Sequence, residues 1–138
     1  DLYPTLLSAA QLDLLPEQHR DGIDLNQYFS SGAKRDRLMQ RPLYFHYPHY
    51  SNQGGLPGAA IRQGNWRLIE RFEDGKVHLY DLANDIGERI ELANRAPERV
   101  SLLRKKLHKW YQQTNARFLK TKGNKTPWKP DFKAGLYL

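Results

Sequence analysis

Two histidines lie among aromatic side chains in the segment 41–50, which reads Arg-Pro-Leu-Tyr-Phe-His-Tyr-Pro-His-Tyr. A solvated loop seldom carries so many large rings, and an ordinary strand seldom holds two imidazoles and a proline. Imidazoles can donate hydrogen bonds to an anion, and aromatic faces can cover a sugar ring. We therefore interpret this segment as a binding site, or one edge of a site, with His46 and His49 as candidate substrate contacts.

The guanidinium of Arg62 is a third candidate substrate contact. A guanidinium is always charged and can donate hydrogen bonds to the oxygens of an anion. A structural role is the alternative in each case. His46 and His49 could satisfy backbone groups at a sheet edge, and Arg62 could lie solvated on a strand.

The same stretch contains no complete catalytic constellation. Ser51 lies close to His49, but no elbow glycine pattern and no third triad member accompany it. Two histidines three positions apart in an extended segment point to opposite faces unless Pro48 turns the chain, which disfavours a metal site. The chain has no cysteine and no phosphate-loop or dinucleotide glycine pattern. We therefore assign no catalytic residue, metal ligand or cofactor to these residues.

Alternating side chains predict the strands that carry the candidates. The first strand runs from position 42 to Pro48, with both of its faces at least partly covered. Residues 59–64 and 66–72 form two more strands joined at Gly64-Asn65, a pair suited to a tight turn. Residues 77–80 form a fourth. The connections are short, so neighbouring strands must be antiparallel.

A long helix is predicted after Pro97, because proline suits the first helical position. Apolar and aromatic residues then recur at helical spacing, while Arg104 and other polar residues lie away from this stripe. The stripe comprises Val100, Leu103, Leu107, Trp110, Tyr111 and Thr114. It should pack on the sheet. The predicted fold class is therefore α+β, a small antiparallel sheet of about four strands packed against a long C-terminal helix.

The N-terminal residues show weaker patterns. We predict a short helix at 2–10, a loop at 15–25, a helical turn at 26–29 and a polar connection from Ser30 to Arg37. The short helix has no partner of its own in the sequence, which suggests that the chain is cut from a larger protein.

Two more segments complete the organisation. A short helix is predicted around 88–92. After Phe118 the sequence has no period, so we expect an extended tail pinned by Trp128, Phe132 and Tyr137. The predicted regions are a partial helix and connecting loop from the end of an upstream domain at 1–40, an α+β subdomain at 41–120 and a basic tail at 121–138.

Composition limits the chain to one modest core. It has 138 residues, 39% of them hydrophobic, and a mean hydropathy of -0.80. No apolar run approaches the roughly 18 residues of a membrane span, and the first residues lack signal-peptide blocks. The total net charge is +7, but residues 98–138 carry 11 Lys or Arg against Glu98 and Asp131, a net of +9. The excess basicity therefore belongs to the last helix and the tail.

Several motifs, taken in order, resemble the C-terminal portion of type I, formylglycine-dependent sulfatases. The motifs are Asp1-Leu2-Tyr3-Pro4-Thr5, Asp21-Gly22-Ile23-Asp24-Leu25, Phe45-His46-Tyr47-Pro48-His49-Tyr50, Ala60 to Ile69, and Leu79-Tyr80-Asp81-Leu82. Asp85, Glu88, Leu92 and Ala93 continue the pattern, but Glu91 stands where asparagine is common. The resemblance covers about positions 1–120.

The resemblance implies a subdomain that packs against a larger α/β catalytic domain and borders its substrate pocket. Family members use a Cys or Ser converted to formylglycine and a calcium ion, and both would lie upstream of this sequence. The full-length protein would hydrolyse sulfate esters, on a carbohydrate by our reading, in the periplasm or outside the cell. The expected partners are that catalytic domain and a sulfated carbohydrate or other sulfate ester.

The basic helix and tail support an alternative reading, a non-enzymatic module that binds an acidic polysaccharide or nucleic acid. Nucleic acid is the weaker choice, because the lysines are not interleaved with an aromatic stacking platform. A purely structural subdomain is the third reading.

Overall fold

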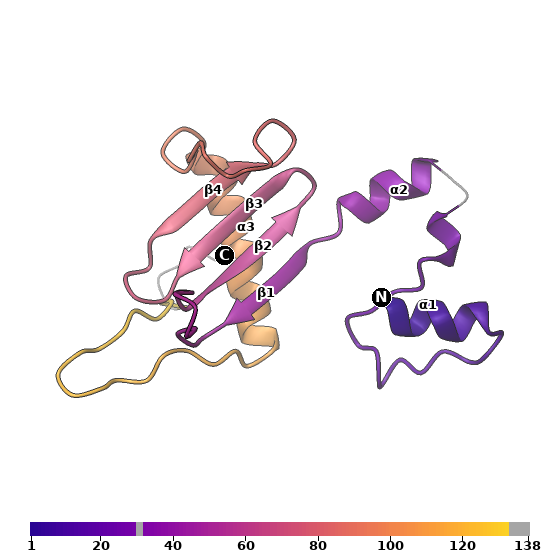
Figure 1. The fold of residues 1–138 in the computed structure, drawn as a ribbon, viewed down its shortest axis with the longest axis horizontal. Helices are drawn as coiled ribbons and strands as arrows, with labels where there is room; N and C mark the ends of the chain where they lie inside the picture. Colours follow the sequence, from indigo (N-terminus) through magenta and orange to yellow (C-terminus); the bar gives the residue numbers. More distant parts are fainter. Residues whose placement is uncertain (30–31, 133–138) are drawn as a thin grey trace. The chain divides into compact units, whose positions relative to one another are not determined.

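The structure is a computed structural model that describes residues 1–29 and 32–132. The chain divides into two units, Asp1–Arg41 and Pro42–Leu138, which are described separately below. Figure 1 traces the elements of both.

The first unit contains α1 (Leu2–Ala9), the short 3₁₀ helix η1 (Asn26–Tyr28) and α2 (Gly32–Met39). The predicted short helix, helical turn and intervening loop are confirmed. The polar connection predicted for 30–37 is wrong from residue 32 onward, because this segment continues as α2. It contains alanine, lysine, arginine, leucine and methionine, all good helix formers.

The ends of the first unit are held together by polar contacts. The Thr5 hydroxyl donates to the Asp1 carbonyl over 2.7 Å and accepts from the Leu25 amide over 2.9 Å. The Asp1 carboxylate receives the Arg41 guanidinium, with an Nη1–Oδ1 distance of 2.9 Å. These contacts tie the start of α1 to the loop before η1 and to the residue that precedes the sheet.

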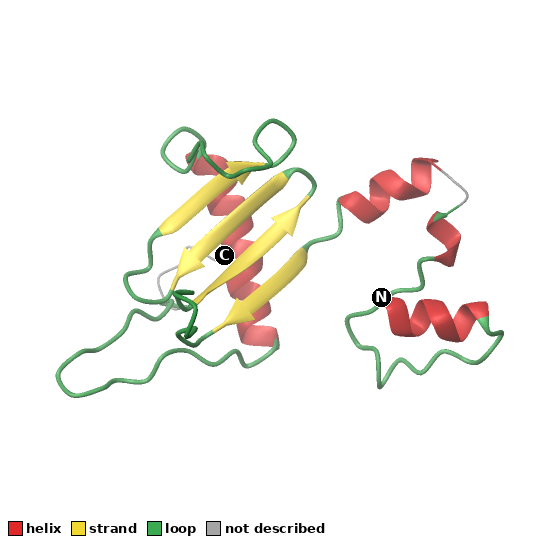
Figure 2. Ribbon diagram, in the orientation of Figure 1, coloured by secondary structure: helices red, strands yellow, loops and turns green. Residues whose placement is uncertain are grey.

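The second unit is a four-stranded antiparallel sheet with one helix against it. The strands are β1 (Leu43–Tyr47), β2 (Gly58–Gln63), β3 (Trp66–Arg71) and β4 (Val77–Asp81), and they lie side by side in chain order. Helix α3 (Pro97–Gln113) crosses one face, as Figure 2 shows. The predicted α+β fold class is confirmed.

Turn chemistry explains the β2–β3 hairpin. Gln63 pairs with Trp66, and Gly64 has a φ of 58°, a left-handed conformation that glycine adopts without the Cβ penalty. The two-residue connection also sets the register, which places Ile61 opposite Leu68 on the helix-facing side.

The core lies between the sheet and α3. Ile61, Leu68 and Leu79 contribute from the strands, and Leu103 and Leu107 contribute from the helix, all at 1% exposure or less. Phe72 and Tyr111 extend this cluster. The predicted packing stripe is therefore confirmed for its central residues.

One buried charge lies within this core. The Glu70 side chain on β3 is fully buried and receives Arg104 Nε over 2.6 Å, His108 Nε2 over 2.8 Å and the Tyr111 hydroxyl over 3.1 Å. His108 is itself fully buried, although the sequence did not mark it as part of the packing face. Arg104 reaches the carboxylate from the edge of the apolar stripe. Four side chains thus join the sheet to the helix through one polar network.

The helix predicted around 88–92 is wrong. Side-chain carboxylates instead capture the backbone amides there: Asp85 accepts from Ile90, and Glu91 Oε1 accepts from both Leu79 and Ala93. Glu88 also adopts a positive φ of 53°. Glu91, which departs from the residue common in sulfatases, therefore fastens this loop to β4.

Both faces of β1 are partly covered, as predicted, but to different extents. Tyr44 and His46 face α3 and are half-buried, whereas Phe45 and Tyr47 on the other face are 56% and 53% exposed. We call the side of the sheet away from α3 the open face. Its described residues are Leu43, Phe45, Tyr47, Ala60, Arg62, Arg67, Ile69, Arg71, His78 and Tyr80.

The tail is pinned as predicted by two of the three aromatics. Trp128 stacks near Phe72, with centroids 6.5 Å apart, and the Phe132 ring lies 6.1 Å from His108. Tyr137 lies outside the described residues. Across residues 1–29 and 32–132 we find no helix long and apolar enough to cross a membrane.

Replacing Glu70 tests whether the buried network holds sheet and helix together. Glu70→Gln removes the charge and leaves Arg104 and His108 facing an amide, so we expect a loss of about 3 kcal/mol in the free energy of unfolding. Urea denaturation followed by circular dichroism measures it. Glu98→Gln, at an exposed position on α3, should change stability by about 0.5 kcal/mol or less. Equal effects of the two substitutions would contradict the role of the network.

Candidate functional site

His46, the first candidate, is built into the helix-facing side of β1. Its Nε2–H donates to the Arg117 carbonyl over 2.7 Å. Four rings surround the imidazole at centroid distances between 5.3 and 6.0 Å: Phe72, Trp110, Tyr111 and Phe118. The side chain therefore joins β1 to the segment that follows α3.

The surroundings of His46 favour its neutral form. Burial lowers the pKa of His46 below its ordinary value of 6.5, and nearby His49 acts in the same direction, while the Arg117 carbonyl opposes the shift. Among the described residues, Nδ1 has no hydrogen-bond partner, and it is closed to solvent. Both ring nitrogens are thus turned inward.

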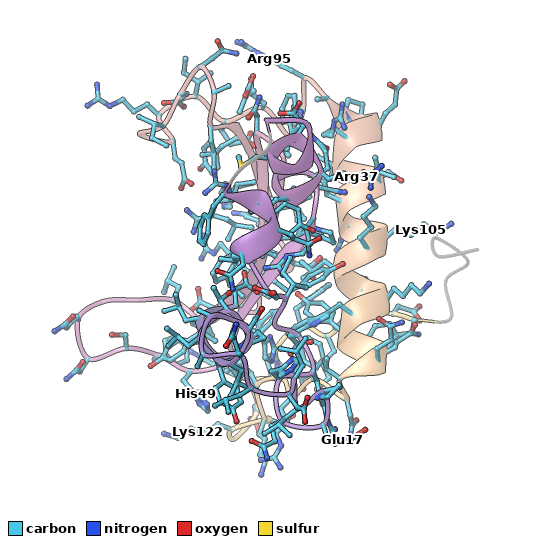
Figure 3. All side chains as sticks on the ribbon, turned by 90° about the vertical axis from the view of Figure 1, so that its right-hand side faces the viewer. Glu17, Arg37, His49, Arg95, Lys105 and Lys122 are labelled. Carbon is cyan, nitrogen blue, oxygen red and sulfur yellow. The ribbon has the colours of Figure 1, made fainter. Side chains whose placement is uncertain are left out.

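His49 lies beyond β1, after Pro48 ends the strand. It is exposed, and its ring meets the edge of Tyr47 at a centroid distance of 5.6 Å. Tyr47 belongs to the open face, so His49 lies where that face meets the end of β1. Figure 3 labels His49 at the same end of the second unit as Lys122 in the tail.

Arg62 points to the open face of β2. Its cross-strand neighbours are Leu43 and Arg67. Arg67 forms an ion pair with Glu88 at 2.5 Å, whereas Arg62 makes no ion pair within residues 1–29 and 32–132. The structure therefore places His46 and Arg62 on opposite sides of the sheet, and the three candidates do not form a single cluster.

A pocket of about 590 Å³ next to this end of β1 was not predicted from the sequence. Its lining comes from the residue after His49, the β3–β4 turn and the tail: Tyr50, Glu73, Leu119, Lys120, Lys122, Lys125, Thr126 and Pro127. We call it the tail pocket. The histidine and aromatic run gives a signal for Tyr50, and the excess basicity of residues 98–138 gives one for the lysines, but neither pattern places them around one pocket.

Within the described lining of the tail pocket, the one carboxylate, Glu73, is already paired. Glu73 accepts from Arg71 Nη2 over 2.8 Å and from the Tyr50 hydroxyl over 3.0 Å. The Arg71 hydrogen bond is the main cause that lowers the pKa of Glu73, and Tyr50 adds to it. The same contact with Glu73 raises the pKa of Tyr50. Glu73 thus stays a carboxylate, and Tyr50 stays a phenol, at neutral pH.

Metal binding was tested on the side chains themselves. In the part of the chain that the structure describes, no three His, Asp or Glu residues come together to hold an ion. The calcium ion implied by the sulfatase resemblance would lie upstream of this sequence, so these residues do not bear on its site.

The α+β subdomain defined by this sheet and helix recurs in solved structures. The protein Ps i-CgsB in complex with k-i-k-neocarrahexaose aligns with a TM-score of 0.64 and 24% identity, covering 87% of this chain and 26% of that one. A protein bound to its substrate D-glucosamine-2-N,6-O-disulfate aligns with a TM-score of 0.66 and 20% identity, covering 83% and 24%. The putative sulfatase yidJ from Bacteroides fragilis aligns with a TM-score of 0.58 and 19% identity, covering 85% of this chain and 25% of that one.

Sequence comparison points to the same family. A curated protein named Sulfatase, from Formosa agariphila, is 29% identical over 128 residues, which are 84% of this chain and 23% of that protein. No protein-family model matches. The sequence match bears out the resemblance to sulfatases, and the solved structures share the fold of this chain. The chain spans about a quarter of the length of the relatives it matches.

The buried imidazole predicts a specific pH dependence. The pKa of His46 is lowered in the folded state, so the unfolded state binds more protons as the pH falls from 6.5 toward the folded value. The contribution of neutral His46 is complete above pH 6.5 and is lost below it. His46→Gln keeps an N–H for the Arg117 carbonyl but cannot titrate.

Thermal unfolding at pH 7.5 and 5.0 measures this effect. The melting temperature of the native protein should fall more than that of the His46→Gln variant. The control variant His49→Gln alters a neighbouring exposed histidine. Its melting temperature should fall between pH 7.5 and 5.0 by nearly as much as that of the native protein. Identical pH profiles for the native protein and the His46→Gln variant would refute the assignment.

Proposed function

We propose that this chain forms the substrate-bordering C-terminal subdomain of a sulfatase that hydrolyses sulfate esters on a carbohydrate. The observation that carries the proposal is the sequence match to the Formosa agariphila sulfatase, which extends over 84% of the chain. The shared fold of the solved structures supports it independently.

The ligands of two structural relatives support a carbohydrate substrate. One was crystallised with k-i-k-neocarrahexaose, and the other with D-glucosamine-2-N,6-O-disulfate as its substrate. Both ligands are sugars, and the second carries two sulfate groups. An anionic sugar also suits the positive and aromatic surface at the end of β1.

The chemistry of ester cleavage would come from the rest of the enzyme. The formylglycine nucleophile and the calcium ion implied by the resemblance have no counterparts in this sequence, which lacks cysteine and the corresponding motif. We propose that the open face packs against the missing catalytic domain. Phe45 and Tyr47 would then be buried between the two domains, because large exposed aromatics commonly mark such contacts.

This arrangement suggests a division of labour among the three candidates. His49 and Arg62 are exposed or half-buried and make no ion pair within the described residues, so they would donate to the substrate or to groups around its pocket. His46, with both ring nitrogens turned inward, would instead fix the end of β1 from which His49 extends. Secretion to the periplasm or beyond remains part of the proposal by family resemblance.

The 138-residue chain by itself should not hydrolyse an aryl sulfate, because it supplies no nucleophile. Release of a chromogenic phenol from an aryl sulfate ester measures this. Turnover that persists through purification and disappears on substitution of a residue in this chain would contradict the proposal.

In the full-length enzyme, His49→Ala or Arg62→Ala should lower kcat/KM for the natural substrate by about tenfold, the effect of losing one charge-assisted contact in the transition state. Steady-state kinetics on the purified enzyme measures it. Lys105→Ala, on the outer side of α3 (Figure 3), is the matched control and should leave kcat/KM unchanged. An unchanged kcat/KM in both His49→Ala and Arg62→Ala would refute the proposed substrate contacts.

A further inference from the structure

The tail pocket gathers three lysines without acidic partners. Lys120, Lys122 and Lys125 line its tail side, and none forms an ion pair with any residue in 1–29 or 32–132. Because Glu73 is already compensated by Arg71, the pocket carries an excess of positive charge. Concentrated charge in a concave surface attracts anions more strongly than the same charge on a flat one.

The backbone that presents these lysines is held in place. Lys122 and Lys125 pair through reciprocal backbone hydrogen bonds of 3.3 and 3.2 Å, which close a tight turn. Further along, Trp128 lies directly over Gly75, where a Cβ would come within 2.5 Å of the indole nitrogen. The Arg104 guanidinium covers the same indole at 5.7 Å. At the start of the segment, Phe118 packs against Phe72 with ring centroids 5.1 Å apart, so both ends of the lysine segment are attached to the body of the fold.

The rest of the lining suits a sugar rather than a bare anion. The Tyr50 ring, Leu119 and Pro127 supply apolar surface for the C–H face of a pyranose. The Glu73 carboxylate can accept from sugar hydroxyls, which are donors. A volume of about 590 Å³ accommodates one or two sugar rings.

The same carboxylate disfavours a nucleic-acid backbone. Phosphodiester groups carry no hydroxyl to donate to Glu73, so a nucleic-acid backbone would leave its acceptor sites unused. The aromatic surface of the pocket is the single ring of Tyr50, whereas single-stranded nucleic acids are bound on successive stacking platforms. An anionic sugar satisfies the lysines and Glu73 together.

We propose that the tail pocket binds an anionic sugar residue of a polysaccharide, through a sulfate or carboxylate held by Lys122 and Lys125 and hydroxyls directed to Glu73. This subsite rests on the proposed function, in which the substrate is a sulfated carbohydrate. It would select polymers that carry a second negative charge near the cleaved sulfate.

Titration calorimetry on the 138-residue chain tests the proposal with five probes. They are a sulfated carrageenan hexasaccharide, a hyaluronan hexasaccharide with carboxylates alone, a neutral agarose hexasaccharide, inorganic sulfate and a single-stranded DNA of equal charge. The test variant Lys122→Gln/Lys125→Gln is compared with Lys105→Gln/Lys109→Gln, which removes the same charge from exposed positions of α3. Thermal unfolding verifies that both variants fold.

We expect the sulfated or carboxylated hexasaccharide to bind, with its affinity reduced about tenfold or more in the tail variant and less than about twofold in the helix variant. Preference for one probe identifies the anionic group as sulfate or carboxylate. Chemical-shift changes in the amides of residues 119–127 should accompany binding.

Other results would overturn the proposal. One is an equal loss of hexasaccharide affinity in the tail variant and the helix variant. Another is binding of the neutral hexasaccharide, or of inorganic sulfate, that is as tight as binding of the charged hexasaccharides. The last is binding of the DNA that is tighter than binding of the charged hexasaccharides. Should Lys122→Gln/Lys125→Gln fail to fold, single Lys122→Gln and Lys125→Gln variants give the same comparison. If the charged hexasaccharide binds but the full-length enzyme does not hydrolyse sulfate esters, the proposed function alone is contradicted. If the enzyme hydrolyses sulfate esters but the hexasaccharide does not bind, the subsite alone is contradicted.

Discussion

The contact between the Glu70 carboxylate and α3 is the constraint on which the rest of the second unit depends. A carboxylate buried at this depth is costly unless donors surround it, and Arg104, His108 and Tyr111 supply them. All three donors lie on α3, so the helix can satisfy Glu70 only in one rotation and one position along the sheet. Apolar burial alone would tolerate several rotations and positions of the helix. We infer that the network gives the helix its unique placement and the apolar stripe provides most of the stabilisation.

That placement organises the surfaces with a candidate function. Tyr111 donates to Glu70 and also forms part of the ring cluster around His46, so the same helix face orients the end of β1. The helix closes one side of the sheet and thereby leaves Arg62 and the exposed aromatics on the other. Trp128 stacks against the same core, and its attachment brings the lysine-bearing tail beside Tyr50. The candidate site residues and the tail pocket are thus arranged around one buried core.

Local periodicity predicted the strands and α3, because alternation and the helical stripe depend on neighbouring residues alone. It failed at 88–92, where Glu91 binds the amide of Leu79 on another element. It also missed Glu70, although that residue shares strand parity with Leu68 and Phe72 and could have been recognised as facing the core. The residue types alone single out His46 and His49. Only the structure shows that His46 faces α3 from within β1, whereas His49 lies exposed beyond the end of that strand. The tail pocket depends on the contact of Trp128 with Gly75, and no sequence pattern links positions so far apart.

We propose that this subdomain borders the active site of a sulfatase, with its open face against the catalytic domain. Hydroxyl-radical footprinting of Phe45 and Tyr47, in the isolated chain and in the full-length enzyme, tests it most directly. Both side chains are more than half exposed here, and Leu102 on α3, 45% exposed, serves as the internal reference. The account predicts that labelling of Phe45 and Tyr47 falls sharply in the full-length enzyme while labelling of Leu102 is unchanged. Equal labelling of Phe45 and Tyr47 in the two proteins would contradict it.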